Sequence, residues 1–192
     1  MARRNPEETR QRILQAATDL FYARGIRAVG VDAIAAEAGV TKRTMYKHFE
    51  SKDALIVCYL EARDEPVLTG LINSIANAPG DIADRIASMF IALAKRAEGK
   101  SWQGCPFARA VSELRDADTG DVAKIAGDHK HTFEHWLEMH LAADSVESAD
   151  LVARQVMVLL DGCITQLLIH RDSSYAYASA KAARCLIRAR CP

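Results

Sequence analysis

The sequence has few aromatic residues and no run of glycine or proline. Its 10 Gly and 5 Pro stand singly among 192 residues, and Phe, Trp and Tyr together make up 6%. Alanine, the residue with the highest helix propensity, is abundant instead. The absence of Gly- and Pro-rich segments therefore favours an all-α chain, long enough for one or two domains with a sizeable core.

Cysteines are also sparse and have no metal-ligand spacing. The five, at positions 58, 105, 163, 185 and 191, are scattered and odd in number, which is typical of reduced thiols in the cytosol. MARRNPEETR lacks the apolar segment of a secretory signal. The stretch VMVLLDGCITQLLI is interrupted by Asp161 and is too short to span a bilayer. We therefore expect a cytoplasmic protein with no membrane partner.

The sequence contains none of the common catalytic motifs. It has no Gly-rich phosphate loop, no G-x-S-x-G and no H-E-x-x-H. We therefore expect no catalytic residues, no cofactor and no enzyme activity. A helical scaffold or an enzyme without DNA binding remains the alternative from a different functional class.

Excess charge of either sign is absent overall, but the two parts of the chain differ. The formal net charge is zero. Residues 1–50 carry nine basic and six acidic side chains, a charge of +3, so residues 51–192 carry −3. A basic segment on an acidic body indicates a local site for a polyanion rather than a generally adhesive surface.

Helix start and stop signals divide the N-terminal third into short elements. Asn5 and Pro6 begin a helix that Gly25 ends. Two short helices, at about 32–38 and 41–49, flank Gly39-Val40, and a fourth helix begins after Ser51. Pro66 should kink or end that fourth helix. Further patterns predict helices at 81–98, 106–115, 119–141, 146–171 and 174–190, about nine in all.

The 41–49 helix has two different faces. Met45 and Phe49 are four residues apart, as are Arg43 and Lys47, and the pairs are offset by about 200° around the helix. The helix is about 12 Å long and would fit a DNA major groove of about 12 Å. A solvated charged surface helix is the alternative interpretation. Two short helices joined by a glycine turn have the spacing of a helix-turn-helix.

The stretch that begins at Gly25, GIRAVGVDAIAAEAGVTKRTMYKHFESKDALIVCYL, resembles the signature of TetR-family transcriptional regulators. This resemblance implies a helix-turn-helix DNA-binding domain at 1–50 and a larger helical regulatory and dimerisation domain at 51–192. It also implies a homodimer on a palindromic double-stranded operator, most often a repressor, released from DNA by a small-molecule effector.

The resemblance also assigns DNA-binding roles to eight residues. Base- and backbone-reading positions fall on Thr41, Lys42, Arg43 and Thr44, and phosphate-contacting positions on Tyr46, Lys47, His48 and Lys52. Arg43 is the best candidate for a bidentate contact to a guanine edge. The sequence departs from the family pattern at Gly30, where Ser or Thr is common, although glycine can also occupy an N-cap.

The last two predicted helices are the expected dimer interface. The 146–171 helix is apolar almost all round, so it needs burial on more than one side. The residues expected to pair with a second copy in a four-helix bundle are Leu159, Leu160, Ile164, Leu167, Leu168, Ala183, Leu186 and Ile187. A core within one chain is the alternative.

A small-molecule site is expected among aromatic and histidine side chains of the helical body. The candidates are Phe90, Trp102, Phe107, His129, Phe133, Trp136 and His140, with ordinary core packing as the alternative. His131 and His135 lie one helical turn apart, but a solvated stripe is favoured over a metal site. Cys105 precedes Pro106 at a predicted helix start, so an oxidant- or electrophile-sensing thiol is a further alternative.

Overall fold

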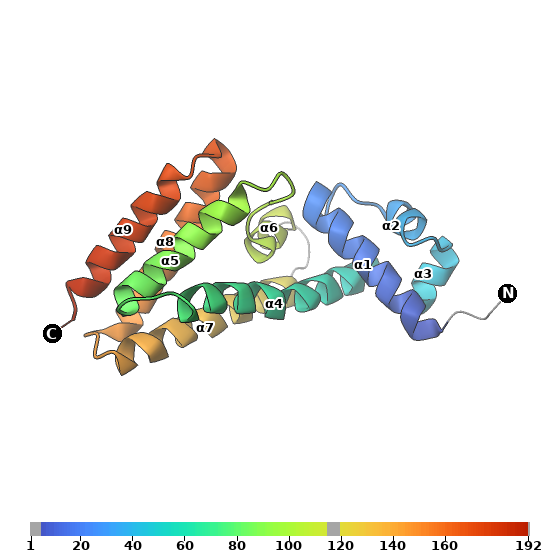
Figure 1. Cartoon of the computed structure of the whole chain (residues 1–192). Coiled ribbons are helices and arrows are strands. Elements are labelled where there is room, and N and C mark those ends of the chain that lie inside the picture. The colour runs from blue at the N-terminus through green and yellow to red at the C-terminus, as the bar shows by residue number, and fades with distance from the viewer. Residues whose placement is uncertain (1–4, 115–119, 192) are drawn as a thin grey trace. The chain divides into compact units, whose positions relative to one another are not determined.

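The computed structural model describes residues 5–114 and 120–191. In these residues all the regular secondary structure is α-helix. Nine helices, α1 to α9, occur in the described ranges (Figure 1). The chain divides into two compact units, which are treated separately below. Unit 1 consists of Met1–Asp64 and Pro106–Gly127, and unit 2 of Glu65–Cys105 and Asp128–Pro192. The expected all-α fold with about nine helices is confirmed.

Helix α1 spans Pro6–Arg24 and has the predicted ends. The side chain of Asn5 accepts a hydrogen bond from the backbone N–H of Glu7 at 3.1 Å, which satisfies one of the free N–H groups at the helix start. Gly25 ends the helix with a φ of 94°, a conformation that an L side chain rarely adopts. Helices α2 (Val31–Glu37) and α3 (Lys42–His48) follow.

Helix α4 spans Lys52–Ala76 and does not end at Pro66. Of the predicted kink or end, the end is excluded because Pro66 lies inside the helix, and the kink stays a prediction. A proline in this position removes one backbone hydrogen bond. Pro66 is on the exposed side, where water can satisfy the carbonyl that loses its partner. The division between the two compact units falls after Asp64, within the same helix.

An apolar core holds the N-terminal helices of unit 1 together. Ile13 and Phe21 of α1, Ile34 of α2 and Met45 of α3 are buried. The Tyr59 ring of α4 meets the Phe21 ring edge-on, with centroids 5.5 Å apart. The first part of α4 therefore belongs to the same compact unit as the short helices, as does α6 (Pro106–Glu113). The domain boundary after residue 50 stays a prediction.

Unit 2 is built around α5 (Ile82–Ala97), α8 (Ala149–His170) and α9 (Ser174–Arg188). These helices contact one another and lie side by side in Figure 1. Helix α7 (Gly120–Ala143) begins in unit 1 and continues into unit 2. Two predicted helix ends, Arg115 and Thr119, lie outside the described residues.

Helix α8 has 22 residues, and by length and apolar composition it alone among the described helices would suit a membrane span. The sequence analysis considered only the stretch VMVLLDGCITQLLI, which is shorter than the apolar helix in the structure. A core helix of a helical protein passes the same test. Val152, Val156, Leu160 and Leu167 of α8 are buried in the apolar core of unit 2.

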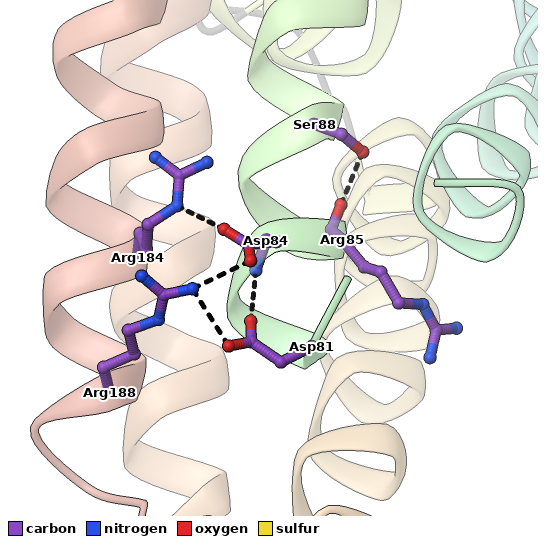
Figure 2. A network of polar contacts seen from close by, with 6 residues as sticks. All are labelled: Asp81, Asp84, Arg85, Ser88, Arg184 and Arg188. Atoms are coloured by element: carbon purple, nitrogen blue, oxygen red, sulfur yellow. Dashed lines mark hydrogen bonds and ion pairs between the residues drawn. The ribbon is translucent and has the colours of Figure 1, made fainter. Parts of the chain in front are cut away.

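A charged network joins the start of α5 to the end of α9. Asp81 caps α5 by accepting from the backbone N–H of Asp84 at 2.8 Å. Arg184 donates to Asp84 at 2.6 Å, and Arg188 donates to both Asp81 and Asp84 at 2.9 and 2.8 Å. Figure 2 shows both guanidinium groups directed from α9 toward the two carboxylates. The network fixes the last helix of the chain to a helix about 100 residues earlier.

Candidate nucleic-acid interface

A glycine turn connects α2 to α3. Gly39 has a φ of 62°. Its N–H donates to the Ala36 carbonyl at 3.1 Å, and the Val40 N–H donates to the Ala35 carbonyl at 2.9 Å. This pair of bonds is the Schellman arrangement, which satisfies carbonyls left free at a helix end. The turn therefore fixes the direction in which the chain leaves α2 and enters α3.

Helix α3 is capped and anchored on one side. The Thr41 hydroxyl accepts from the backbone N–H of Thr44 at 3.1 Å. Met45 and Phe49 are buried, and the Arg10 guanidinium lies 4.8 Å from the centre of the Phe49 ring. Such a contact between a cation and a ring contributes about 0.5–2 kcal/mol. Arg10 thus holds the end of α3 against α1, a role that no local sequence pattern indicated.

The opposite side of α3 is exposed and basic, as the sequence predicted. Arg43 and Lys47 are exposed, and Tyr46 is 45% exposed. Thr44 and His48 are partly buried at the edges of this face. Because α3 is held by its apolar side, its basic side chains reach solvent without any change in the backbone. This arrangement suits a helix that inserts into the major groove.

Lys42 lies on the same helix but is paired with an acidic residue. Its Nζ lies 3.2 Å from the carboxylate of Asp32 on α2, and both side chains are mostly exposed. The bridge joins the two short helices and offsets part of the Lys42 charge. Exposed pairs contribute about 0–1 kcal/mol, so a phosphate can replace Asp32 as the partner of Lys42 at little cost.

Lys52 is half-buried at the start of α4. Its Nζ donates to the Ile26 carbonyl at 2.7 Å and lies 5.9 Å from the centre of the Phe21 ring. A lysine ammonium has three donors, so this bond leaves two for a phosphate. Gly30, where the sequence departs from the family pattern, occupies the N-cap of α2 without a side-chain bond.

Comparison with known proteins agrees with this geometry. The sequence model described as bacterial regulatory proteins, tetR family, matches residues 13–57, which contain both short helices and the glycine turn. The crystal structure of SCO4454, a TetR-family transcriptional regulator from Streptomyces coelicolor, superposes with a TM-score of 0.84 at 28% identity. The superposition covers 98% of this chain and 93% of the SCO4454 chain. Residues 13–57 therefore have the sequence of the tetR-family DNA-binding segment, and the whole chain has the fold of a TetR-family regulator.

Two curated relatives match part of this chain. The transcriptional regulator SrpR of Pseudomonas putida is 43% identical over 61 residues, which are 32% of this chain and 29% of SrpR. The transcriptional repressor SCO4008 of Streptomyces coelicolor is 32% identical over 113 residues, 57% of each protein. These matches span less than two thirds of either relative. Both are named as regulators of transcription rather than as enzymes.

The predicted dimer residues do not share one surface in the structure. Leu160, Leu167, Ala183 and Ile187 are buried in the core of unit 2. Ile164 and Leu168 are partly buried beside Gly104, where an added Cβ would lie 2.6 Å from the Leu168 side chain. Leu159 and Leu186 are partly exposed and line a groove formed by α8 and α9. Buried side chains are not available to a second copy.

The outer face of α8 and α9 instead contains an apolar groove of about 470 Å³. Val158 is 69% exposed and Leu151 is 41% exposed, values that are unusual for apolar side chains of a helix. The residues that line the groove are Leu151, Arg154, Gln155, Val158, Leu159, Ala182 and Leu186. The carbonyl oxygen of the Gln155 side chain is buried there without a hydrogen-bond partner.

The candidate ligand residues are buried or partly buried side chains. Phe90, Trp102 and Phe133 belong to the core of unit 2, and His129 is buried. Trp136 stacks on His140 with centroids 3.8 Å apart, and His140 Nδ1 donates to the Trp136 carbonyl at 2.7 Å. Phe107 is buried in unit 1, so it is grouped apart from the other six.

The exposed histidines of α7 and the thiol of Cys105 are the remaining candidates from the sequence. His135 contacts Glu138 at 3.3 Å on the exposed side of α7, and Glu134 pairs with Arg154 at 3.0 Å. Within residues 5–114 and 120–191, no three His, Cys, Asp or Glu side chains are arranged to hold a metal ion. Cys105 is partly exposed immediately before α6.

Proposed function

We propose that this chain is a ligand-responsive transcriptional repressor that binds a palindromic operator as a homodimer. The observation that supports this proposal is the packing of α3. Met45 and Phe49 are buried on one face of the helix, and Arg43 and Lys47 are exposed on the opposite face. Arg43 reads a guanine edge, while Lys42, Lys47 and Lys52 neutralise phosphates. Thr41, Thr44, Tyr46 and His48 supply hydroxyl, phenol and imidazole contacts to the backbone.

Binding to the DNA that flanks its own gene tests the proposal. Fluorescence anisotropy would compare that fragment with a shuffled duplex of equal length, across salt concentrations from about 50 to 200 mM. We expect tighter binding to the native fragment and an affinity that falls linearly with salt on logarithmic axes. The proposal fails if neither duplex binds at the lowest salt concentration.

The dimer forms through the groove face of α8 and α9 rather than through the full set of residues expected from sequence. Leu159 and Leu186 remain in the interface, joined by Leu151 and Val158. Exposed small side chains follow one stripe of α9 and its C-cap and allow a partner helix to approach closely: Ala178, Ala182, Cys185 and the C-cap residue Ala189. A two-fold axis would place the same apolar groove on both copies, as an isologous interface requires. Dimer formation should therefore protect Cys185 from alkylation.

The effector binds in the helical body and releases the DNA. The chain has two tryptophans, Trp102 and Trp136, and both belong to unit 2 and to the candidate ligand set. Intrinsic fluorescence therefore reports on that region directly. A compound screen should find molecules that change the emission and also lower operator affinity. The variant Trp136→Phe assigns the signal to one side chain, and compounds that change emission but not operator affinity would argue against release.

Repression and a cytoplasmic location follow from the same proposal. A dimer on an operator near a promoter blocks transcription, and the bacterial chromosome lies in the cytoplasm. A reporter gene behind the flanking DNA should be less active when this protein is co-expressed. Higher reporter activity with the protein present would make it an activator.

A second candidate is regulation through the thiol of Cys105. The supporting observation is its position, partly exposed and directly before α6, the helix whose Arg109 and Glu113 bond the α1–α2 turn. Peroxide would oxidise the thiol to a sulfenic acid and release water. Operator affinity should then fall in the parent protein but not in Cys105→Ser. Equal affinity before and after mild peroxide would exclude this candidate.

A further inference from the structure

The turn between α1 and α2 is held by side chains of α6. Arg109 Nη1 donates to the Tyr22 carbonyl at 2.8 Å. The backbone N–H of Arg27 donates to Glu113 Oε2 at 3.1 Å. Arg109 and Glu113 are themselves joined, with Arg109 Nε 2.8 Å from Glu113 Oε1. One charged pair from a later part of the chain therefore bonds the backbone on both sides of Gly25.

The Arg109 bond satisfies a carbonyl at the end of α1 that has no partner within the helix. Carbonyls in the last turn of a helix have no partner within that helix, and the Tyr22 carbonyl is one of them. A cation near a helix C-terminus is also favoured by the helix dipole. The Arg109 and Glu113 side chains are only 30% and 21% exposed, so the pair is shielded from much of the solvent screening that weakens surface ion pairs.

The backbone at Gly25 fits closely against this pair. A Cβ at Gly25 would lie 3.0 Å from Arg109 Nη2 and 3.0 Å from each carboxylate oxygen of Glu113. Its φ of 94° and ψ of 152° lie in a region that only glycine occupies readily. The turn and α6 are therefore shaped to one another, in addition to being bonded.

The position of this turn determines the positions of α2 and α3 relative to α1. Ile26 and Val29, within the turn, are buried, and α2 begins two residues after Val29. From α2 the glycine turn at Gly39 leads into α3 with both of its closing bonds made. A shift of the α1–α2 turn would therefore displace α2 and the exposed basic face of α3 relative to α1.

We propose that Arg109 and Glu113 are positioning residues for DNA binding, an inference that rests on the proposed function. They contact no DNA themselves. They hold the α1–α2 turn so that α1 and α3 present one continuous surface to the duplex. Residues of α6 thereby contribute to operator affinity, although the sequence signature of the DNA-binding segment ends about 50 positions earlier.

Full-length Arg109→Met and Glu113→Gln variants test this inference. Each should lower operator affinity about tenfold, the amount expected when a charge-assisted hydrogen bond is lost. The combined variant should lose little more than either alone, because the two side chains act as one unit. The salt dependence of binding should keep the slope of the parent, because no phosphate contact is removed.

A matched control distinguishes positioning from general stability. Glu138→Gln removes the carboxylate that pairs with His135 on α7 in unit 2, away from the groove lining, and should leave operator affinity unchanged. Amide hydrogen exchange at residues 26–29 should speed up in both α6 variants and not in the control. A purely structural role would lower the melting temperature while leaving the affinity of the folded protein unaltered.

The outcomes separate this inference from the function on which it rests. If the parent protein binds no DNA, the proposed function is wrong. A parent that binds, with Glu113→Gln folded and equal to it in operator affinity and in exchange at residues 26–29, overturns the inference alone. Glu113→Gln keeps the size of the side chain, so it provides a folded variant if Arg109→Met does not fold.

Discussion

At the level of single residues, the basic face of α3 depends on two side chains that point away from it. Met45 is completely buried, and the ring of Phe49 is held by Arg10. Neither would contact DNA. Both determine whether Arg43 and Lys47 are presented on a rigid helix or on a mobile segment.

Met45→Ala should therefore destabilise the protein. Truncation of a buried methionine costs about 2–5 kcal/mol, because the transfer free energy is lost and a cavity remains. Chemical denaturation followed by circular dichroism would measure the free energy of unfolding. Met139→Ala is the matched control, because Met139 is 57% exposed on α7 and its truncation should change stability by less than about 0.5 kcal/mol. Equal effects of both changes would contradict the anchoring role.

Arg43 and Lys47 should differ in what their removal does to DNA binding. Arg43→Ala should cost about 1–3 kcal/mol on the operator and relax the preference at one base pair, whereas Lys47→Ala should weaken all duplexes alike and reduce the salt slope by about one. Competition binding with single-base operator variants would measure both effects. Lys95→Ala on α5, which belongs to unit 2, serves as a charge control and should change neither quantity.

At the level of elements, the charged network between α5 and α9 makes stability depend on pH. The pKa of Asp81 is lowered from its ordinary value of 3.8, first by the backbone N–H of Asp84 and then by the Arg188 side chain. A lowered pKa in the folded state means that the carboxylate stabilises the protein above pH 3.8. That contribution is lost as the pH falls below 3.8 through the folded-state pKa.

Asp81→Asn should reduce the pH dependence of stability as the pH falls below 3.8, where the unfolded state takes up the proton first. Asparagine is itself a good N-cap, so α5 should remain intact. Unfolding midpoints across this range would measure the effect. Arg188→Gln should give an intermediate result, because the Asp84 N–H still lowers the pKa of Asp81 in that variant. The same pH dependence in parent and Asp81→Asn would remove Asp81 as a cause.

At the level of the whole molecule, the proposed dimer depends on the apolar groove of α8 and α9. A side chain such as Val158, 69% exposed in the single chain, is best explained by burial against a second copy. A dimer also matches the two half-sites of a palindromic operator, because helix-turn-helix dimers bind half-sites about one helical turn apart. Dimer formation and operator affinity are therefore expected to be lost together.

Val158→Asp should produce monomers and a large loss of operator affinity. Sedimentation at micromolar concentration would distinguish the 21.1 kDa chain from a species of twice that mass. Met139→Asp places the same charge on a similarly exposed apolar side chain of α7 and should leave the dimer intact. A parent protein that sediments as a monomer would contradict the groove assignment.

The sequence by itself determined the elements and the basic face of α3. Asn5, Gly25, Gly39 and Thr41 mark helix ends through short-range hydrogen bonds and backbone angles, so their effect can be read within a few positions. The four-residue spacing of Met45 and Phe49 separates the buried side of α3 from its exposed side for the same reason.

Only the tertiary structure decided which surfaces those elements use. Helix α8 is apolar almost all round, so periodicity does not distinguish Leu160, which is buried in its own core, from Val158, which is exposed. Lys42 and Asp32 are ten positions apart, and Arg109 and Tyr22 are 87 apart. Such pairs form only when the chain has folded, because charge and hydrogen-bond complementarity over that separation leaves no periodic signal in the sequence.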